Sequence, residues 1–387
     1  MNILFLVYHG FSDVSGISKK IHAQVKGLRE NNHRVFLCYY DFAVNGHRCR
    51  FVDGEVLRDY GTGWFAGLRQ RTEYDSVYRF CVENGVQMVY ARCFQNASPP
   101  LVRLFARLRK AGIRAVTEVP TYPYDGEFRN FPLSVRLKLA VDRLFRRRLA
   151  RQMAAMVTFS DALEIFGRRT IRISNGVDFD AIPLHQPPAA TDGAIHLIGV
   201  AEVHYWHGYD RLVEGLGRYK ADCPEGRPVV FHIVGGICRA DYEGDGWRKG
   251  IGALIRQYGL EKNVVLHGQL FGHALDEVFS QCCFAVGSLA RHRSGITVIK
   301  TLKNREYASR GIPFMYSECD SDFDNRPYVM RVPADESPID VGSVVSFIGS
   351  HTFSPAEIRS SVAHLSWRNQ MQKVVEAVTD MADDEAQ

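Results

Sequence analysis

The residues whose types and spacing point most directly to chemistry lie between Arg293 and Met315. Two lysines, Lys300 and Lys303, and one carboxylate, Glu306, share a run that we expect to be helical and to follow a flexible loop. A loop that leads into a helix offers free backbone N–H groups to an anion, and the lysines add positive charge. A carboxylate among these cations suits a ligand that carries hydroxyl groups beside its phosphates. A surface helix with an Arg–Glu pair and a glycine at its end explains the same pattern equally well.

A second candidate site follows a predicted strand at residues 194–200. Its loop contains His204 and His207, with Trp206 between them and Gly208 at the start of the next expected helix. The two histidines are three residues apart in a loop with no third ligand nearby, so no metal site is predicted. Imidazole rings and an indole N–H beside a glycine at a helix start suit contact with a diphosphate and a sugar.

The amino-terminal half offers a third loop. Ser15 and Gly16 lie between an apolar run at residues 2–8, which we expect to be a strand, and a helix. This loop could approach a phosphate or a sugar, and a plain turn between strand and helix is the alternative. The Gly-x-Gly-x-x-Gly pattern of dinucleotide binding is absent here, so NAD is disfavoured.

Candidates for sugar recognition follow two further expected strands. Arg92 falls just past the end of one of them, where open α/β sheets build their sites. After the strand at residues 113–118, two prolines shape a loop that is rich in tyrosines and carboxylates. Its candidate sugar-binding side chains are Tyr122, Tyr124, Asp125 and Glu127. A tightly packed structural loop is the alternative interpretation.

These loops need a scaffold, and the order of the expected elements suggests one. Strand, loop and helix repeat through both halves, separated by a Pro- and Ala-rich stretch without periodicity before residue 193. We therefore expect an α/β fold of two doubly wound (Rossmann-like) parallel-sheet domains facing across a cleft. The expected domains are residues 1–185, joined by a helix at 361–387 that packs back on them, and residues 192–360.

A dense basic helix is expected over residues 133–153. Its apolar side chains recur at helical spacing among basic ones, against the single acid Asp142. The apolar stripe is Leu137, Val141, Leu144, Phe145 and Leu149, and the basic side chains are Arg136, Lys138, Arg143, Arg146, Arg147, Arg148 and Arg151. This density favours contact with an anionic membrane surface. A domain helix that buries its stripe is the alternative, and nucleic acid is disfavoured because no zinc-finger, RNP or aromatic pattern is present.

Composition limits the compartment and the number of domains. A chain of 387 residues exceeds one ordinary core, and its formal charge of +5 is compatible with anionic ligands without requiring them. Nine cysteines without metal-type spacing favour reduced thiols in the cytosol. The apolar run at residues 3–8 is too short for a signal sequence or a membrane span. We expect a cytoplasmic protein, peripheral on the inner face of the cytoplasmic membrane if the basic helix binds lipid.

Five short motifs in this order resemble those of a known enzyme family. They are Ser15–Lys20, Thr121–Asp125, Ser174–Asp178, Trp206–Leu212, and Leu302–Tyr307 with Gly311–Phe314. The chain resembles bacterial glycosyltransferases of the GT-B fold, in the retaining group called family 4, and its subgroup is similar to enzymes of capsule or exopolysaccharide assembly. The resemblance implies a nucleoside-diphosphate sugar bound to the carboxyl-terminal domain. It also implies a glycan or lipid-linked oligosaccharide acceptor on the amino-terminal domain, and no metal or other cofactor.

The resemblance also implies roles for single residues. Glu306 matches the second Glu of the family's Glu-x7-Glu motif, which holds the ribose, whereas Val298 stands where the first Glu is expected. His207 occupies the position of a lysine that binds the diphosphate. The catalytic set is Lys303, Glu306 and His207. The donor-binding set is Ser15, Gly16, Glu202, Trp206, Gly208, Gly236, Gln269, Leu270, Ser294, Gly295, Ile296, Thr297 and Lys300, with the base contacted near Gln269 and Leu270.

The expected activity is transfer of a sugar to an acceptor hydroxyl with retention of the anomeric configuration. Positive charge and backbone amides, including those near residues 295–297, would stabilise the leaving diphosphate. Two alternatives remain open: a sugar-nucleotide 2-epimerase with a similar cleft, and a non-catalytic binding protein that serves as a partner subunit.

Overall fold

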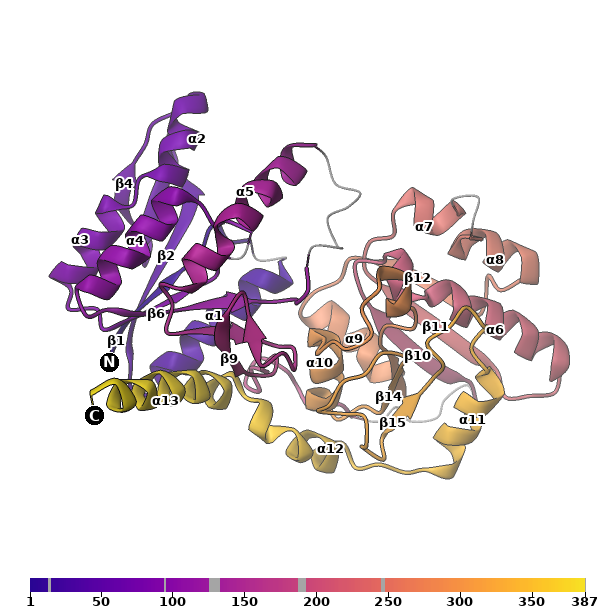
Figure 1. Cartoon of the computed structure of the whole chain (residues 1–387). Helices are drawn as coiled ribbons and strands as arrows, with labels where there is room; N and C mark the ends of the chain where they lie inside the picture. The colour runs from indigo at the N-terminus through magenta and orange to yellow at the C-terminus, as the bar shows by residue number, and fades with distance from the viewer. Residues whose placement is uncertain (13–14, 94, 125–132, 187–192, 245–247, 387) are drawn as a thin grey trace. The chain divides into compact units, whose positions relative to one another are not determined.

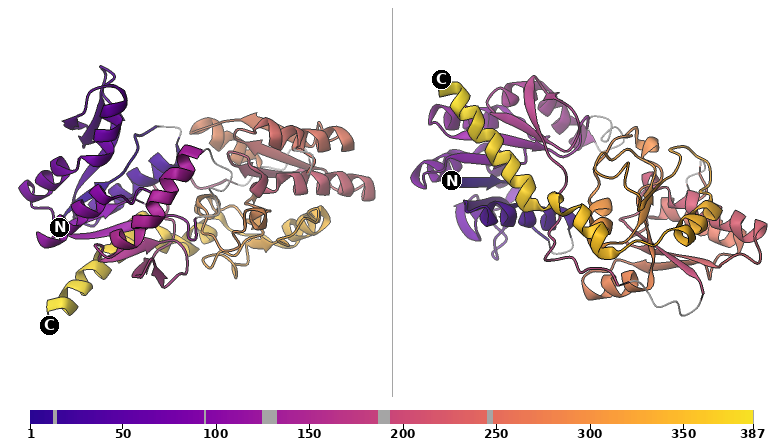
Figure 2. Two further views of the ribbon diagram at one scale, coloured as in Figure 1. Left: turned by 45° about the horizontal axis from the view of Figure 1, so that its top comes forward. Right: turned by 90° about the horizontal axis from the view of Figure 1, so that it is seen from below.

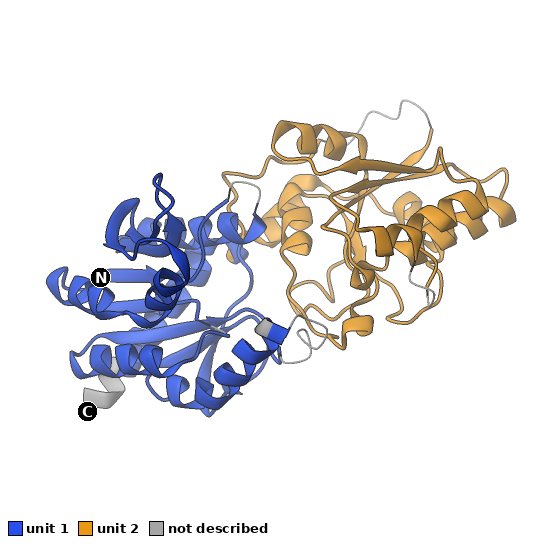
Figure 3. Cartoon of the chain, turned by 90° about the horizontal axis from the view of Figure 1, so that it is seen from above, with its two compact units in different colours: residues 1–176, 365–387 blue, residues 177–364 orange. Residues whose placement is uncertain are grey.

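The computed structural model describes residues 1–387 except 13–14, 94, 125–132, 187–192, 245–247 and 387. The chain divides into two compact units, shown in Figure 3. Unit 1 comprises residues 1–176 and 365–387, and unit 2 comprises residues 177–364. Each unit has a sheet and a hydrophobic core of its own.

Unit 1 is built on a nine-stranded sheet in the order β4-β3-β2-β1-β5-β6-β7-β9-β8 (Figure 1). Its strands are β1 (Asn2–Leu6), β2 (Arg34–Phe42), β3 (Arg48–Val52), β4 (Glu55–Asp59), β5 (Met88–Ala91), β6 (Arg114–Val119), β7 (Ala155–Thr158), β8 (Glu164–Ile165) and β9 (Arg168–Arg172). Its helices are α1 (Gly16–Glu30), α2 (Gly63–Thr72), α3 (Asp75–Glu83), α4 (Pro99–Lys110), α5 (Leu133–Ala150) and α13 (Trp367–Ala386). The run from β2 through β1, β5, β6 and β7 to β9 is parallel, and β3, β4 and β8 are antiparallel additions.

Apolar residues on both faces of β1 explain why the strand is central. Leu4 and Leu6 join the core that α3, α4 and α5 cover, whereas Ile3 and Phe5 join the core under α1 and α13. Continuous burial of this kind is typical of a parallel strand with helices on both sides. Figure 2 shows α13 running along unit 1, where Trp367 lies so close to Gly27 that a Cβ on this glycine would meet the backbone at 2.7 Å.

Unit 2 is built on a six-stranded, fully parallel sheet in the order β12-β11-β10-β13-β14-β15. Its strands are β10 (Ile195–Val200), β11 (Val229–Val234), β12 (Val264–Gly268), β13 (Phe284–Val286), β14 (Phe314–Tyr316) and β15 (Val329–Arg331). Its helices are α6 (Tyr209–Asp222), α7 (Arg239–Glu243), α8 (Ile251–Tyr258), α9 (His273–Gln281), α10 (Leu302–Arg310), α11 (Val341–Ser350) and α12 (Pro355–Ser361). Short 3₁₀ helices are η1 (Tyr205–His207), η2 (Arg291–Ser294) and η3 (Ala363–Leu365).

Both sheets reverse their strand order at one point. In unit 1 the reversal falls between β1 and β5, and in unit 2 it falls between β10 and β13. Ligands of open α/β sheets bind outside the carboxyl ends of the strands at such a switch point, because the two neighbouring loops diverge there. The loops after these four strands are therefore where each unit can build a site.

Two predicted helices have different bounds in the structure. The helix predicted to carry Lys300 begins only at Leu302, because Thr301 caps it by accepting a hydrogen bond from the backbone N–H of Asn304. Lys300 therefore precedes the helix. The basic helix predicted to reach residue 153 ends at Ala150. Among the described residues, no helix is both long and apolar enough to cross a membrane.

Candidate functional site

The switch point of unit 2 gathers polar side chains from the loops after β10 and β13. The two loops are joined where the backbone N–H of Leu289 donates to the carbonyl of His207 at 2.8 Å. Gly208 sits at this junction with φ 65°, and a Cβ there would meet Ala290 at 2.7 Å. A side chain would both strain the backbone and push the loops apart, so the close approach requires glycine.

Lys303 is the central cation of this site. It lies in the first turn of α10, and its ammonium nitrogen is buried without a hydrogen-bond partner among the described residues. Burial lowers the pKa of Lys303, Arg291 lowers it further, and Glu318 acts in the opposite direction. A buried ammonium group without a partner is costly, so a site that keeps one is prepared for an anion.

Glu318 is a carboxylate that the sequence analysis missed. Both of its oxygens are buried and lack a hydrogen-bond partner in the described part of the chain, and burial raises its pKa. The residues that follow Glu318 are held in place by Arg305, which is fully buried and forms ion pairs with Asp320 and Asp322. Glu318 follows β14 in an irregular stretch without any motif, and only the fold shows that it lies near Lys303.

Two more polar groups of this region were also missed. Ser288, just after β13, has a buried hydroxyl without a partner among the described residues. Arg291 lies close enough to lower the pKa values of both His207 and Lys303, and its guanidinium carbon is 5.6 Å from the ring centre of Trp206. In the sequence, the only indication that Ser288 and Arg291 belong to a site is that both follow shortly after an apolar strand.

His207 is placed at the site, but without the charge that was expected of it. Its Nδ1 accepts the backbone N–H of His204 at 2.9 Å. Burial lowers the pKa of His207 well below its usual value, and Lys303 and Arg291 lower it further. The ring is therefore neutral at pH 7, and with Nδ1 as acceptor its proton sits on Nε2. His207 can donate a hydrogen bond but cannot add positive charge.

Two of the predicted anion-binding amides after Ser294, those of Gly295 and Ile296, are used within their own turn. The N–H of Gly295 donates to His292, the N–H of Ile296 donates to Arg291, and the Ser294 hydroxyl donates to Arg291 as well. These groups close η2, so the prediction that they form a free helix N-terminus is wrong. Arg293 holds η2 in place by binding both carboxylate oxygens of Asp210, at 3.0 and 2.9 Å.

The residues after Ile296 pair through their backbone with the segment that follows β14. The carbonyl of Thr297 accepts the N–H of Cys319 at 2.7 Å, and Val298 forms an isolated bridge with the same cysteine. Lys300 is half-buried between this bridge and α10. The stretch from Thr297 to Lys300 therefore runs beside the segment that contains Glu318.

Glu306 lies on the same helix as Lys303 and is half-buried. Its Oε1 accepts two hydrogen bonds from Arg310, at 3.1 and 2.9 Å, and Arg310 also binds Asp276. This is the Arg–Glu pair that the alternative interpretation of the stretch described. Among the described residues, the hydrogen bonds to Glu306 reach Oε1 only, so Oε2 remains for a ligand hydroxyl group.

A second group of predicted residues meets at the carboxyl ends of β10, β11 and β12. Gln269 donates a hydrogen bond to Glu202 at 3.1 Å, and a Cβ on Gly236 would lie 2.5 Å from the same carboxylate. Leu270 follows Gln269 and is half-buried. The structure thus brings Glu202, Gly236 and Gln269 together, as their positions after neighbouring strands suggested.

Two of the predicted acceptor-binding residues, Arg92 and Tyr124, pack into the core of unit 1. Arg92 is buried and binds the fully buried Glu118 at 3.0 Å, and Lys20 binds the same oxygen at 3.2 Å. Tyr124 is also buried and donates to Asp142 at 2.7 Å. Both side chains therefore satisfy buried carboxylates, and for Tyr124 this is the tightly packed loop that the alternative interpretation described.

The other predicted residues of unit 1 have varied environments. Ser15 caps α1 by accepting the N–H of Ser18, and Gly16 opens the helix with free space around it. Tyr122 is half-buried, with its ring 5.8 Å from that of Phe166. Asp125 and Glu127 lie outside the described residues. Across the described residues of both units, no group of three or more His, Cys, Asp and Glu side chains could hold a metal ion.

Comparison with known proteins identifies the architecture. No protein-family model and no curated protein sequence matches the chain. Among solved structures, a glycosyltransferase from Rickettsia africae aligns over 98% of both chains with 12% identity and a TM-score of 0.61. The fold is GT-B. The catalytic domain of starch synthase IV from Arabidopsis thaliana, bound to ADP and acarbose, aligns over 98% of both chains with 9% identity and a TM-score of 0.59. HepE from Anabaena, in complex with UDP-glucose, aligns over 100% of this chain and 99% of its own with 14% identity and a TM-score of 0.51.

Proposed function

We propose that this GT-B protein is a glycosyltransferase of the retaining family 4 type, which moves a sugar from a nucleoside diphosphate to an acceptor hydroxyl group. The observation that carries the proposal is the buried, unpartnered Lys303 at the switch point of unit 2. A diphosphate would supply the anionic hydrogen-bond acceptor that this ammonium group lacks. The two solved relatives with ADP and UDP-glucose bound support a nucleotide ligand for this fold.

In the proposed reaction, the bond between the sugar C1 and the diphosphate oxygen breaks, and C1 forms a bond to the acceptor oxygen. The acceptor's proton passes to a phosphate oxygen on the same face, so that nucleoside diphosphate is released and the configuration at C1 is retained. Lys303 stabilises the negative charge that develops on the leaving group, and His207 donates a hydrogen bond from Nε2. Fixed charges and donors of this kind contribute most of the rate enhancement in many enzymes.

The remaining donor contacts in this proposal come from the neighbouring loops. Glu306 binds the ribose hydroxyl groups through its available oxygen, and the base lies near Gln269 and Leu270. Glu318 takes the place of the family's first motif glutamate and binds the sugar. This assignment is supported by the bridge between Val298, where that glutamate is expected, and the residue after Glu318.

We further propose that the acceptor belongs to cell-surface polysaccharide assembly and is met at the inner face of the cytoplasmic membrane. Helix α5 supports the membrane contact, because Leu137, Val141 and Leu144 are 59%, 46% and 68% exposed. The stripe was predicted either to bind lipid or to pack inward. Leu149 and Phe145 pack on the core of unit 1, and the exposure of the other three side chains supports contact with lipid. Exposed arginines on the same helix suit anionic headgroups.

A sugar-nucleotide 2-epimerase is the second candidate. Glu318 favours it, since burial raises the pKa of this carboxyl group toward the range in which it could exchange a proton with a sugar carbon. Incubation with the donor alone separates the two functions. An epimerase converts the donor without an acceptor, whereas a transferase leaves its configuration unchanged.

The first test is calorimetric titration with UDP, GDP, ADP, CMP and dTDP, using wild type, Glu306→Ala and the surface variant Glu261→Ala as a matched control. We expect one nucleotide to bind wild type and the control equally, and to bind Glu306→Ala at least tenfold more weakly. No binding of any nucleotide to wild type would overturn the proposal. Binding without transfer to any acceptor would point instead to a non-catalytic partner subunit.

A further inference from the structure

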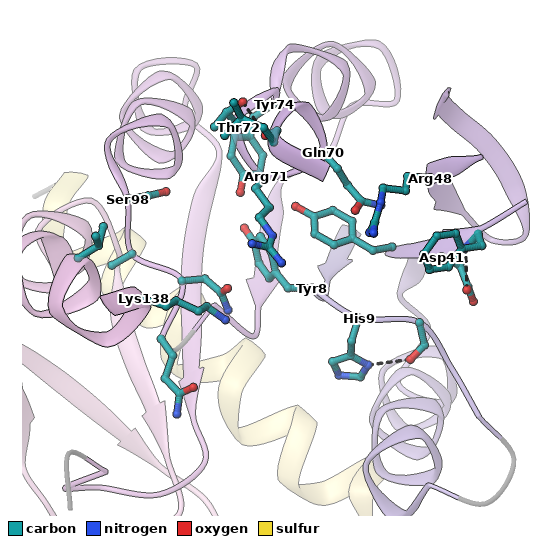
Figure 4. A pocket seen from close by; sticks show the side chains of 18 residues that line it. Tyr8, His9, Asp41, Arg48, Gln70, Arg71, Thr72, Tyr74, Ser98 and Lys138 are labelled. Carbon is teal, nitrogen blue, oxygen red and sulfur yellow. Dashed lines mark hydrogen bonds between the residues drawn. The ribbon is translucent and has the colours of Figure 1, made fainter. Parts of the chain in front are cut away.

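Unit 1 has a pocket of about 600 Å³ at its own switch point, shown in Figure 4. The loop after β1 contributes Tyr8 to Gly10, and the loop after β5 contributes Gln95 to Ser98. The strands β2 and β3 and the helices α2 and α5 contribute further walls. This is the position where the topology places a ligand, and neither Arg92 nor Tyr124 lines it.

The lining of this pocket is positively charged. Arg48, Arg71 and Lys138 face a single carboxylate, that of Asp41. Figure 4 shows the side chains of Arg71 and Lys138 extending into the same space, with Asp41 well away from Lys138. Neither Arg71 nor Lys138 forms an ion pair with a carboxylate of the described residues. The pKa of Lys138 is lowered, first by burial and next by Arg71, and Asp142 acts in the opposite direction, so Arg71 lies close enough to Lys138 to act on its charge.

A second observation comes from the loop after β5. Gln95 adopts φ 61°, a left-handed conformation that is costly for a residue with a side chain. Its Nε2 is buried and has no hydrogen-bond partner among the described residues. Two residues later the loop is fixed, because the N–H of Ala97 donates to Asp142 at 3.0 Å. A strained residue on a fixed loop therefore holds an unused donor at the wall of the pocket.

The rim of the same pocket is apolar. Phe42, Leu68 and Val141 line it and are 58%, 46% and 46% exposed. On α5 the apolar surface continues from Val141 to Leu137 and Leu144. Cations at the walls and exposed apolar side chains at the mouth suit a ligand that joins an anionic group to a hydrocarbon chain.

We propose that this pocket binds a phosphoryl group carried by the acceptor. The proposal rests on the proposed transferase function, since it assigns the acceptor class of that enzyme. Arg71 and Lys138 neutralise the phosphoryl oxygens, and Gln95 donates a further hydrogen bond. A phosphorylated water-soluble sugar and a lipid phosphate share this chemistry, and the apolar rim favours the lipid phosphate.

The test is calorimetric titration of the full chain with hexyl phosphate and, separately, with glucose 6-phosphate. The proteins compared are wild type, the pocket variant Arg71→Gln/Lys138→Gln and the control Arg69→Gln/Arg136→Gln. The control removes the same charge from exposed positions of the same two helices outside the pocket. Each lost cation should weaken binding roughly tenfold, so the pocket variant should bind about a hundredfold more weakly while the control matches wild type.

Each outcome bears on the proposal. Tighter binding of hexyl phosphate assigns a lipid phosphate, and tighter binding of glucose 6-phosphate assigns a soluble sugar phosphate. No binding of either probe to wild type, or equal losses in the two double variants, would overturn the phosphoryl site. Nucleoside diphosphates are titrated into the same proteins, and their binding should be unchanged in the pocket variant. If only the nucleotides fail to bind, it is the proposed transferase function that is wrong.

Discussion

Replacing Lys303 by methionine should make the protein more stable while it loses its affinity for a nucleoside diphosphate. Burial first, and Arg291 next, lower the pKa of this lysine from 10.5 to about 7, against the opposite effect of Glu318. A change of this size corresponds to roughly 4 kcal/mol of destabilisation at neutral pH. Glu318 loses a neighbouring cation in the variant, so we expect about half of this, about 2 kcal/mol, to be recovered.

The sign of the pH dependence follows from the same values. The pKa of Lys303 is lower in the folded than in the unfolded protein, so the unfolded chain holds more protons between about pH 7 and 10.5. The destabilising effect of this lysine is therefore absent above that window, grows as the pH falls through it, and is constant below it. A bound diphosphate favours the charged ammonium, so binding near pH 7 and above should take up a proton.

Two measurements check this reasoning. Differential scanning calorimetry at pH 7 should show the unfolding temperature of Lys303→Met raised by roughly 5 °C, the effect of about 2 kcal/mol on a unit of this size. Titration calorimetry in buffers of different ionisation enthalpy should show proton uptake with wild type and none with the variant, whose affinity falls at least tenfold. Lys262→Met, at an exposed position of unit 2, is the control and should change neither quantity. A Lys303→Met protein that is less stable than wild type and still binds the nucleotide would refute the argument.

Two further predictions concern unit 1. Glu118→Gln should lower the free energy of unfolding by roughly 3–5 kcal/mol, because it leaves the buried cations Lys20 and Arg92 without their carboxylate; an unchanged denaturation midpoint would contradict this. Leu144→Asp should reduce co-sedimentation with phosphatidylglycerol vesicles roughly tenfold, since a side chain that is 68% exposed would no longer enter the lipid. The same substitution at exposed Leu184 of unit 2 should have no effect, and equal losses would show that α5 is not the membrane contact.

The fold class could be predicted because it depends on patterns that are local in the sequence. Ile3 to Leu6 form an uninterrupted apolar run, and burial on both faces of β1 is the reason for it. The parallel arrangement then follows from strands that alternate with helices. The hairpin of β3 and β4 carries no comparable signal, since β4 is almost entirely exposed and its side chains are not selected by a core.

The site could be predicted only in part, because burial of polar groups is decided by packing between distant segments. Lys303 and His207 were both predicted because each stands near the start of a helix that follows a strand, and the structure places both at the switch point of unit 2. Arg92 stands at an equally suggestive position, yet its partner Glu118 comes from the next strand and neutralises it inside unit 1. Whether a charge near a strand end meets a partner depends on side chains that the sequence places far apart.

The contrast between two neighbouring cations of α10 shows how this packing separates structure from function. Arg305 and Lys303 lie two residues apart, and their sequence context gives no reason to prefer either as a ligand contact. In the structure, Asp320 and Asp322 form ion pairs with Arg305, and this pairing fixes the segment that begins with Glu318. Lys303 receives no such partner among the described residues. The paired arginine therefore positions the site, whereas the lysine keeps a buried ammonium group, with Glu318 nearby, that a bound anion would stabilise.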